Sequence, residues 1–151
     1  MSIKSVTEET VSVWGSFASS VWQTDKQVLM EEFAEGKFPF EFLYYSSSGI
    51  AVAWISLSLR HDYVEGCQFS PVAYVEGIFV HPDYRGQGIA AELLDFADSW
   101  AKSHGARELA SDTDFENSHS QAFHTKNGFR EVSRNIHYVR KVEEDKYARI
   151  T

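Results

Sequence analysis

Two segments near the start of the chain carry apolar residues at helical spacing. Thr7 and Asp25 stand before them and are residue types that cap helices. The first apolar face contains Val11, Trp14, Phe17, Ala18 and Val21, and the second contains Val28, Leu29 and Phe33. Gly36 follows the second segment, where a glycine commonly ends a helix. The pattern predicts two consecutive helices.

Other segments favour strands. Residues 3–6, 40–45, 50–60 and 72–80 are short and rich in apolar residues, and residues 46–49 (Ser-Ser-Ser-Gly) predict a hairpin turn. A loop is expected over residues 61–71. Alternation along residues 72–80 predicts one shared face, made of Val72, Tyr74, Glu76, Ile78 and Val80. Gly77 within this strand indicates a bulge.

A third helix is expected from Ile89 to the glycine at position 105, with a broad apolar face. A strand over residues 107–111, a helix capped by Asn117 and ended by Gly128, and strands over 129–133 and 136–141 complete the chain. Helices, antiparallel strands and then alternating strands and helices predict a mixed α/β fold. We expect a single domain over residues 1–142 and a C-terminal tail over 143–151 that frays.

The composition narrows the classes of protein. The 151 residues are 43% hydrophobic, which favours a packed domain, and no apolar run reaches the length of a membrane span. The start of the chain lacks the pattern of a signal peptide, and Cys67 is the single cysteine. These features favour a reducing, cytoplasmic location.

The charge balance bears on the partner. Twenty-two acidic and fourteen basic residues give a net charge of −8. This charge argues against nucleic acid as a partner. It suits a cationic substrate, although acidity can also serve solubility alone.

The segment after the fourth strand is the strongest chemical signal. Arg85, Gly86, Gln87 and Gly88 lie between that strand and the next helix, a position where backbone N–H groups bind phosphate. The segment lacks the Gly-Lys-Ser/Thr of a nucleotide-hydrolysing loop and the third glycine of a dinucleotide site. Arg85 adds a cation suited to a diphosphate. His119 and His124 do not match metal-ligand spacing, so we expect no metal.

Two segments carry a family resemblance. Residues 80–90 resemble the acyl-CoA pyrophosphate motif of the GNAT N-acetyltransferases, and residues 117–129 resemble that family's second motif. Residues 63–66, 70–73, 75–80 and 110–112 are similar to segments of the aminoglycoside 6'-N-acetyltransferases within that family. The resemblance implies a mixed, mostly antiparallel twisted sheet flanked by about four helices, acetyl-CoA as co-substrate, a cationic aminoglycoside as acceptor, and a homodimer.

The resemblance also implies roles for individual residues. It places His124 where the family usually has a tyrosine that acts as general acid. Glu76 is a candidate base on its own chemistry, because partial desolvation in its apolar row would make the carboxylate a better base, directly or through water, and it would also contact the acceptor. The residues expected to hold the CoA arm and its pyrophosphate are Phe79, Val80, Arg85, Gly86, Gln87, Gly88, Ile89, Ala90 and Asn117. The other residues expected at the acceptor are Trp22, Tyr63, Glu65 and Asp112.

Structural alternatives remain for these side chains. Glu76 needs a partner in an apolar row, and a salt bridge would supply one. His124 can simply pack, and Asn117 can act only as a helix cap. For the whole chain, two other functions stay open: acetylation of another amine, such as a polyamine or a protein amino group, and a sensor that binds acyl-CoA without turnover.

Overall fold

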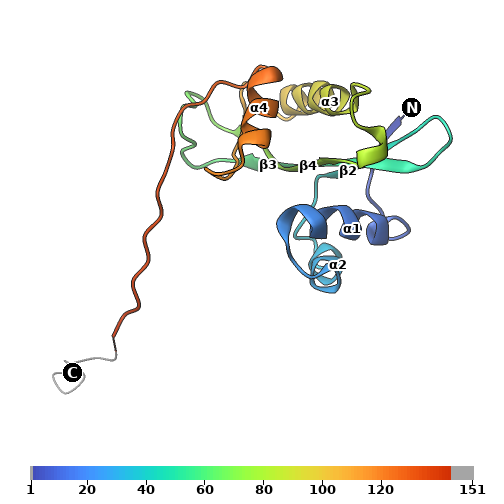
Figure 1. Cartoon of the computed structure of the whole chain (residues 1–151), viewed down its shortest axis with the longest axis horizontal. Coiled ribbons are helices and arrows are strands. Elements are labelled where there is room, and N and C mark those ends of the chain that lie inside the picture. The colour runs from blue at the N-terminus through green and yellow to red at the C-terminus, as the bar shows by residue number, and fades with distance from the viewer. Residues whose placement is uncertain (1, 144–151) are drawn as a thin grey trace.

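The computed structural model describes residues 2–143. Its elements are β1 (Ser2–Ser5), α1 (Val11–Trp22), α2 (Lys26–Ala34), β2 (Glu41–Tyr45), β3 (Ala51–Arg60), β4 (Val72–Val80), a 3₁₀ turn (Pro82–Tyr84), α3 (Ile89–Ser103), β5 (Leu109–Ser111) and α4 (Ser118–Lys126). Helices α3 and α4 cover one face of the sheet and α1 and α2 the other (Figure 1). The predicted mixed α/β fold is confirmed.

The five strands lie in chain order, β1-β2-β3-β4-β5. The first four pair antiparallel. Strand β5 pairs parallel to β4, after the crossover through α3. The sheet is therefore mixed and mostly antiparallel, as expected.

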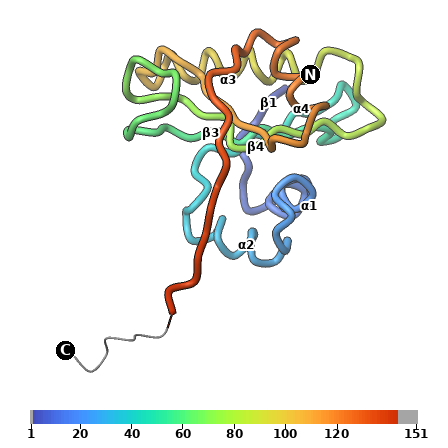
Figure 2. Tube along the Cα trace, turned by 60° about the vertical axis from the view of Figure 1, so that its left-hand side comes forward, coloured from blue at the N-terminus to red at the C-terminus, as the bar shows by residue number. Residues whose placement is uncertain are grey.

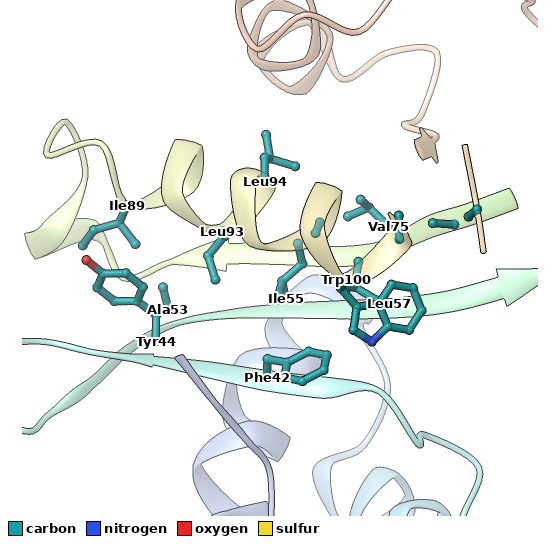
Figure 3. Close-up of a cluster of buried hydrophobic side chains, with 14 of the residues drawn as sticks. Phe42, Tyr44, Ala53, Ile55, Leu57, Val75, Ile89, Leu93, Leu94 and Trp100 are labelled. Carbon is teal, nitrogen blue, oxygen red and sulfur yellow. The ribbon is translucent and has the colours of Figure 1, made fainter. Parts of the chain in front are cut away.

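Two apolar clusters hold the layers together. On the α3 side, Ile55, Leu57 and Val75 from the strands pack against Leu93 and Trp100 (Figure 3). The helical face predicted between Ile89 and Gly105 forms this contact. On the other side, a second cluster joins the sheet to α1 and α2, with its buried members Val6, Trp14, Ala18, Leu29, Leu43 and Trp54.

Strand β4 contains a bulge at Glu76. Ser56 pairs with Gly77 and Leu57 pairs with Val75, so Glu76 is the extra residue. A side chain at Gly77 would clash, because its Cβ would lie 2.5 Å from the Trp54 ring. The bulge indicated by Gly77 is therefore present.

We expected every second residue of β4 from Val72 to Val80 to lie on one face. Because of the bulge, this prediction is wrong beyond Glu76. The extra residue reverses the alternation, so Ile78 and Val80 pack with the α3-side cluster. Phe79 packs on the α1 side, 5.3 Å from the ring of Phe17. Glu76 therefore does not stand in an apolar row with Ile78 and Val80.

Helix boundaries differ from the expectation at one point. Thr10, not Thr7, precedes α1, and the backbone N–H of Thr7 donates to Thr10 Oγ1 at 2.9 Å. Asp25 caps α2 as predicted, accepting from the N–H of Val28. Asn117 caps α4, accepting from the N–H of Ser120.

The two strands expected over residues 129–133 and 136–141 are absent from the described part of the chain. This C-terminal arm, residues 130–143, is extended but pairs with no strand, and it runs away from the sheet (Figures 1 and 2). Alternating apolar residues allow a strand but do not supply its partner. Of the expected tail at 143–151, only Glu143 lies within the described residues.

Among residues 2–143, no helix combines the length and apolar character that crossing a membrane requires.

Candidate functional site

Strands β4 and β5 separate at the bulge. Strand β5 pairs only with Ala73, Tyr74 and Val75. Beyond that point the outer edge of β4, from Glu76 to Val80, has no strand partner in the described residues. Its backbone N–H and C=O groups can pair with an extended, amide-bearing ligand as an added strand would. Phe79 and Val80 lie on this open edge, as expected for residues that hold a CoA arm.

The open edge leads to the loop of residues 85–88, which we term the glycine loop. Gly86 and Gly88 have φ values of 77° and 81°, which side chains disfavour. Within residues 2–143, the N–H groups from Gly86 to Ala90 donate to no backbone or side-chain acceptor. They precede and begin α3, where the helix dipole favours an anion. The donor set fits a pyrophosphate.

Two side chains of this loop serve the fold. Arg85 Nε donates to the carbonyl of Val80 at 2.9 Å, which ties the loop to the end of β4. The Ile89 side chain is 5% exposed and packs in the core, so only its backbone can face a ligand. Gln87 is exposed beside the two glycines.

Glu76 is held by β3. Arg60 Nη2 lies 2.9 Å from Glu76 Oε1, and Ser58 Oγ donates to Oε2 at 2.5 Å. The salt bridge kept open as the structural alternative is therefore present. Both side chains remain partly exposed, at 41% for Arg60 and 30% for Glu76, so the carboxylate is still accessible to a ligand.

The second predicted carboxylate joins the same group. Asp112, directly after β5, accepts a hydrogen bond from the Tyr74 hydroxyl. The Arg60 guanidinium lies over the Tyr74 ring, 3.4 Å from its centroid. Burial, followed by the bond to Asp112, raises the pKa of Tyr74, so the phenol stays protonated. Arg60, Tyr74, Glu76 and Asp112 form what we term the carboxylate network.

Trp22, at the end of α1, reaches the same place. Its Nε1 donates to the backbone carbonyl of Glu76 at 2.9 Å, and its ring meets Trp54 edge-on. The ring also lies against Gly77, whose missing side chain makes room for it. The structure therefore brings Trp22 together with Glu76, as the sequence predicted.

His124 lies on α4 and contacts β5. Its Nδ1 is 2.7 Å from the Ser120 carbonyl, which can only accept, so Nδ1 carries a proton. Its Nε2 is 2.8 Å from Ser111 Oγ and accepts from that hydroxyl when the ring is neutral. His124 can donate a proton from Nε2 only as imidazolium.

Tyr63 and Glu65, on the loop between β3 and β4, lie outside the carboxylate network. Tyr63 is 81% exposed, and it forms no hydrogen bond or ring contact with the described residues. Glu65 accepts from Asn135 of the C-terminal arm. Hydrogen bonds from Ser133 and Asn135 lower the pKa of Glu65.

Three further residues of the site, Ser58, Arg60 and Tyr74, were not predicted as functional from the sequence motifs. A signal for two of them exists, because Ser56, Ser58 and Arg60 alternate with apolar residues along β3. This stripe predicts one polar face near the end of the strand. The bond between Tyr74 and Asp112 has no such signal, because it depends on the parallel pairing of β5.

Comparison with known proteins gives consistent results. The model of the acetyltransferase (GNAT) family matches residues 7–129. An aminoglycoside N(6')-acetyltransferase type 1 from Acinetobacter genomosp. 13 is 34% identical over 145 residues, or 94% of this chain and 99% of the relative. The protein of the same name from Serratia marcescens is 37% identical over 86% of this chain and 92% of its own.

Solved structures agree. The crystal structure of an aminoglycoside antibiotic 6'-N-acetyltransferase from Acinetobacter haemolyticus matches with a TM-score of 0.85 and 31% identity, covering 95% of this chain and 100% of that one. AAC(6')-Iy in complex with the bisubstrate analog CoA-S-monomethyl-acetylneamine matches with a TM-score of 0.82 and 32% identity, over 93% and 98%.

Proposed function

Because the chain belongs to the acetyltransferase (GNAT) family, we propose that it transfers the acetyl group of acetyl-CoA to the 6'-amino group of an aminoglycoside. The observation that carries this proposal is the similarity to aminoglycoside N(6')-acetyltransferases over almost the whole chain. Acetylation removes a positive charge from the antibiotic, so the enzyme would confer resistance. The need for acetyl-CoA and the single cysteine favour the cytoplasm as its location.

Acetyl-CoA supplies the thioester, and the chain offers two features that suit it. The open edge of β4, including Phe79 and Val80, pairs with the extended arm. The N–H groups of residues 86–90 hold the pyrophosphate, with Arg85 as an added charge. Asn117, whose side-chain oxygen already caps α4, retains its amide NH₂ as a donor to the arm.

The carboxylate network binds and activates the acceptor. Asp112 attracts an ammonium group of the aminoglycoside, and Glu76 takes the proton from the reacting amine, directly or through water. The neutral amine then attacks the thioester carbonyl, and the tetrahedral intermediate collapses to the amide as the C–S bond breaks and the nitrogen releases a second proton to water. An unpaired backbone N–H of the β4 edge donates to the developing oxyanion. Trp22 packs beside Glu76 on the acceptor side, and Tyr63 and Glu65 would reach the acceptor only from the loop between β3 and β4, outside the network.

Direct attack of the amine on the thioester, without an acetyl-enzyme intermediate, agrees with the properties of the Cys67 thiol. Burial raises the pKa of the Cys67 thiol, which leaves less of the nucleophilic thiolate at neutral pH. An acetyl-cysteine intermediate is therefore not part of the proposal. Protonation of the departing thiolate falls to His124 in its imidazolium form.

The C-terminal arm supports a homodimer. Ile136, Tyr138, Val139 and Val142 are between 75% and 98% exposed, which is costly for so many neighbouring apolar side chains. The start of the arm is held by the loop between β3 and β4, because Asn135 donates to Glu65 and Val132 packs against Gly66. A second copy of the chain would give these residues a strand to pair with.

Light scattering after size exclusion tests the dimer. The full chain is expected to have twice the mass of one chain, and the double variant Tyr138→Asp, Val139→Asp is expected to have the mass of one. The two positions lie on opposite faces of the arm, so either buried face receives a charge. Ile50→Asp, at an exposed turn, is the control and keeps the dimer. A monomeric wild-type chain would refute this part of the proposal.

A panel of acceptors separates the three functions left open by the sequence. We expect CoA release, followed with a thiol reagent, on kanamycin and tobramycin but not on spermidine or a lysine peptide. Turnover on spermidine or the peptide alone would assign a different amine as acceptor. Calorimetric binding of CoA with no turnover on any amine would indicate a sensor.

A further inference from the structure

Arg60 links the two carboxylates of the network, because it contacts Glu76 directly and also contacts Tyr74, the partner of Asp112. Its guanidinium lies within 2.9–3.2 Å of both oxygens of Glu76. The same group covers the ring of Tyr74, whose hydroxyl donates to Asp112. No role for Arg60 follows from the sequence motifs, and its position at the end of β3 places it across from the start of β4.

The two oxygens of Glu76 are held unequally. Oε2 accepts from Ser58 Oγ at 2.5 Å, from Arg60 Nη2 at 3.0 Å and from Arg60 Nε at 3.2 Å. Oε1 accepts only from Arg60 Nη2, at 2.9 Å, among the described residues. A carboxylate oxygen has two lone-pair sites, so Oε1 retains capacity for a further hydrogen bond.

We propose that Arg60, together with Ser58, positions Glu76 by anchoring Oε2, so that Oε1 is the oxygen that meets the acceptor amine or its bridging water. This inference rests on the proposed function and deepens it, because it assigns the working atom of the base. Arg60 touches neither reacting group in this account and is a positioning residue.

The chemistry of arginine suits this task better than that of lysine. A planar guanidinium bonds a carboxylate through two nitrogens and fixes its plane, whereas an ammonium acts as a point charge. The flat group also stacks on Tyr74. Arg60 therefore restricts rotation of the Glu76 carboxylate and fixes its orientation.

Arg60 also supplies the positive charge beside the base. The titratable groups around Glu76 come from every neighbouring strand: Glu41 on β2, Arg60 on β3, Tyr74 on β4 and Asp112 after β5. Arg60 is the cation among these groups, so its removal leaves Glu76 among acidic neighbours. An opposite charge at this distance favours the ionised carboxylate.

Three variants test the inference. Arg60→Gln removes the charge and the fork, Arg60→Lys keeps the charge and loses the fork, and Lys102→Gln on α3 is a control with the same charge change on the opposite face of the sheet. In Arg60→Lys we expect kcat to fall about tenfold while KM for the aminoglycoside stays near the wild-type value, since the charge remains and the orientation of Glu76 is lost. In Arg60→Gln we expect a larger fall in kcat, again with KM little changed, and in Lys102→Gln neither value should move.

A spectrum without substrates keeps this test separate from the proposed function. Carboxyl ¹³C NMR on the ligand-free chain should show the Glu76 resonance shifted in both Arg60 variants and unchanged in Lys102→Gln, because the carboxylate loses its paired hydrogen bonds from the guanidinium. A Glu76 resonance and a kcat unchanged in both Arg60 variants would overturn the inference. If the wild-type chain acetylates no aminoglycoside but the NMR shift appears, the proposed function fails and the pairing of Arg60 with Glu76 stands.

Discussion

Glu76→Gln is expected to lower kcat for an aminoglycoside at neutral pH by about 10²- to 10⁴-fold, the usual contribution of a general base. The substitution keeps the size of the side chain and an oxygen for Ser58 and Arg60 to donate to. It removes the group that accepts the amine proton. Binding of acetyl-CoA, measured by calorimetry, should stay close to that of the wild type, because the glycine loop is untouched.

The pH dependence of this loss identifies its cause. Above the pKa of the acceptor amine the substrate is already neutral and needs no base, so the variant should recover part of its rate at high pH. Glu8→Gln, an exposed position before α1, makes the same change in charge and should keep the wild-type rate. Wild-type kcat in Glu76→Gln at neutral pH would remove Glu76 as the base.

Glu41→Leu is expected to destabilise the chain by about 3–5 kcal/mol, because it leaves three buried donors without an acceptor. Glu41 is 3% exposed and accepts from the indoles of Trp14 and Trp54, at 2.7 and 3.0 Å, and from the Ser56 hydroxyl at 2.6 Å. These bonds join α1 to β2 and β3 beneath the sheet. Urea unfolding, followed by tryptophan fluorescence, measures the loss.

Whereas Glu41→Leu destabilises the chain, Glu41→Gln is expected to raise its free energy of unfolding at high pH. Burial raises the pKa of Glu41 to about 7 from an ordinary 4.5, so the folded chain holds a proton that the unfolded chain releases. Stability from this group is complete below pH 4.5 and is lost as the pH rises to about 7. The lost stability amounts to about 3 kcal/mol, at 1.36 kcal/mol per pKa unit.

A neutral glutamine avoids this loss while its carbonyl can accept from both indoles. Glu41→Gln should therefore match the wild type near pH 4.5 and exceed its free energy of unfolding by about 2–3 kcal/mol at pH 8. A difference between the two proteins that does not change with pH would contradict a protonatable Glu41. Glu9→Gln, exposed before α1, is the control and should follow the wild type at every pH.

The sequence predicted those parts of the fold that follow from local patterns. Strands β3 and β4 and helices α2 and α3 have strong periodicity, and their ends are marked by Asp25, Gly105 and the turn at residues 46–49. The glycine loop and Asn117 lie where the motifs place them. Each of these depends on residues close together in the chain.

Features that depend on pairing between distant segments were not predictable in the same way. One extra residue at Glu76 reverses the faces of β4, and its register is set by β3. The C-terminal arm has the alternation of a strand but no partner within residues 2–143. Glu41 resembles an ordinary polar residue at the start of a strand, and only the tertiary contact with Trp14 and Trp54 shows that it is buried.

Acetylation at the 6'-amine can be tested by comparing two acceptors that differ at that position. Neomycin and paromomycin differ in carrying an amino or a hydroxyl group at the 6' position, so they form a matched pair of acceptors. With acetyl-CoA and the wild-type chain, we expect mass spectrometry to find neomycin with one added acetyl group and paromomycin unchanged. Equal acetylation of both compounds, or of neither, would contradict the proposed function.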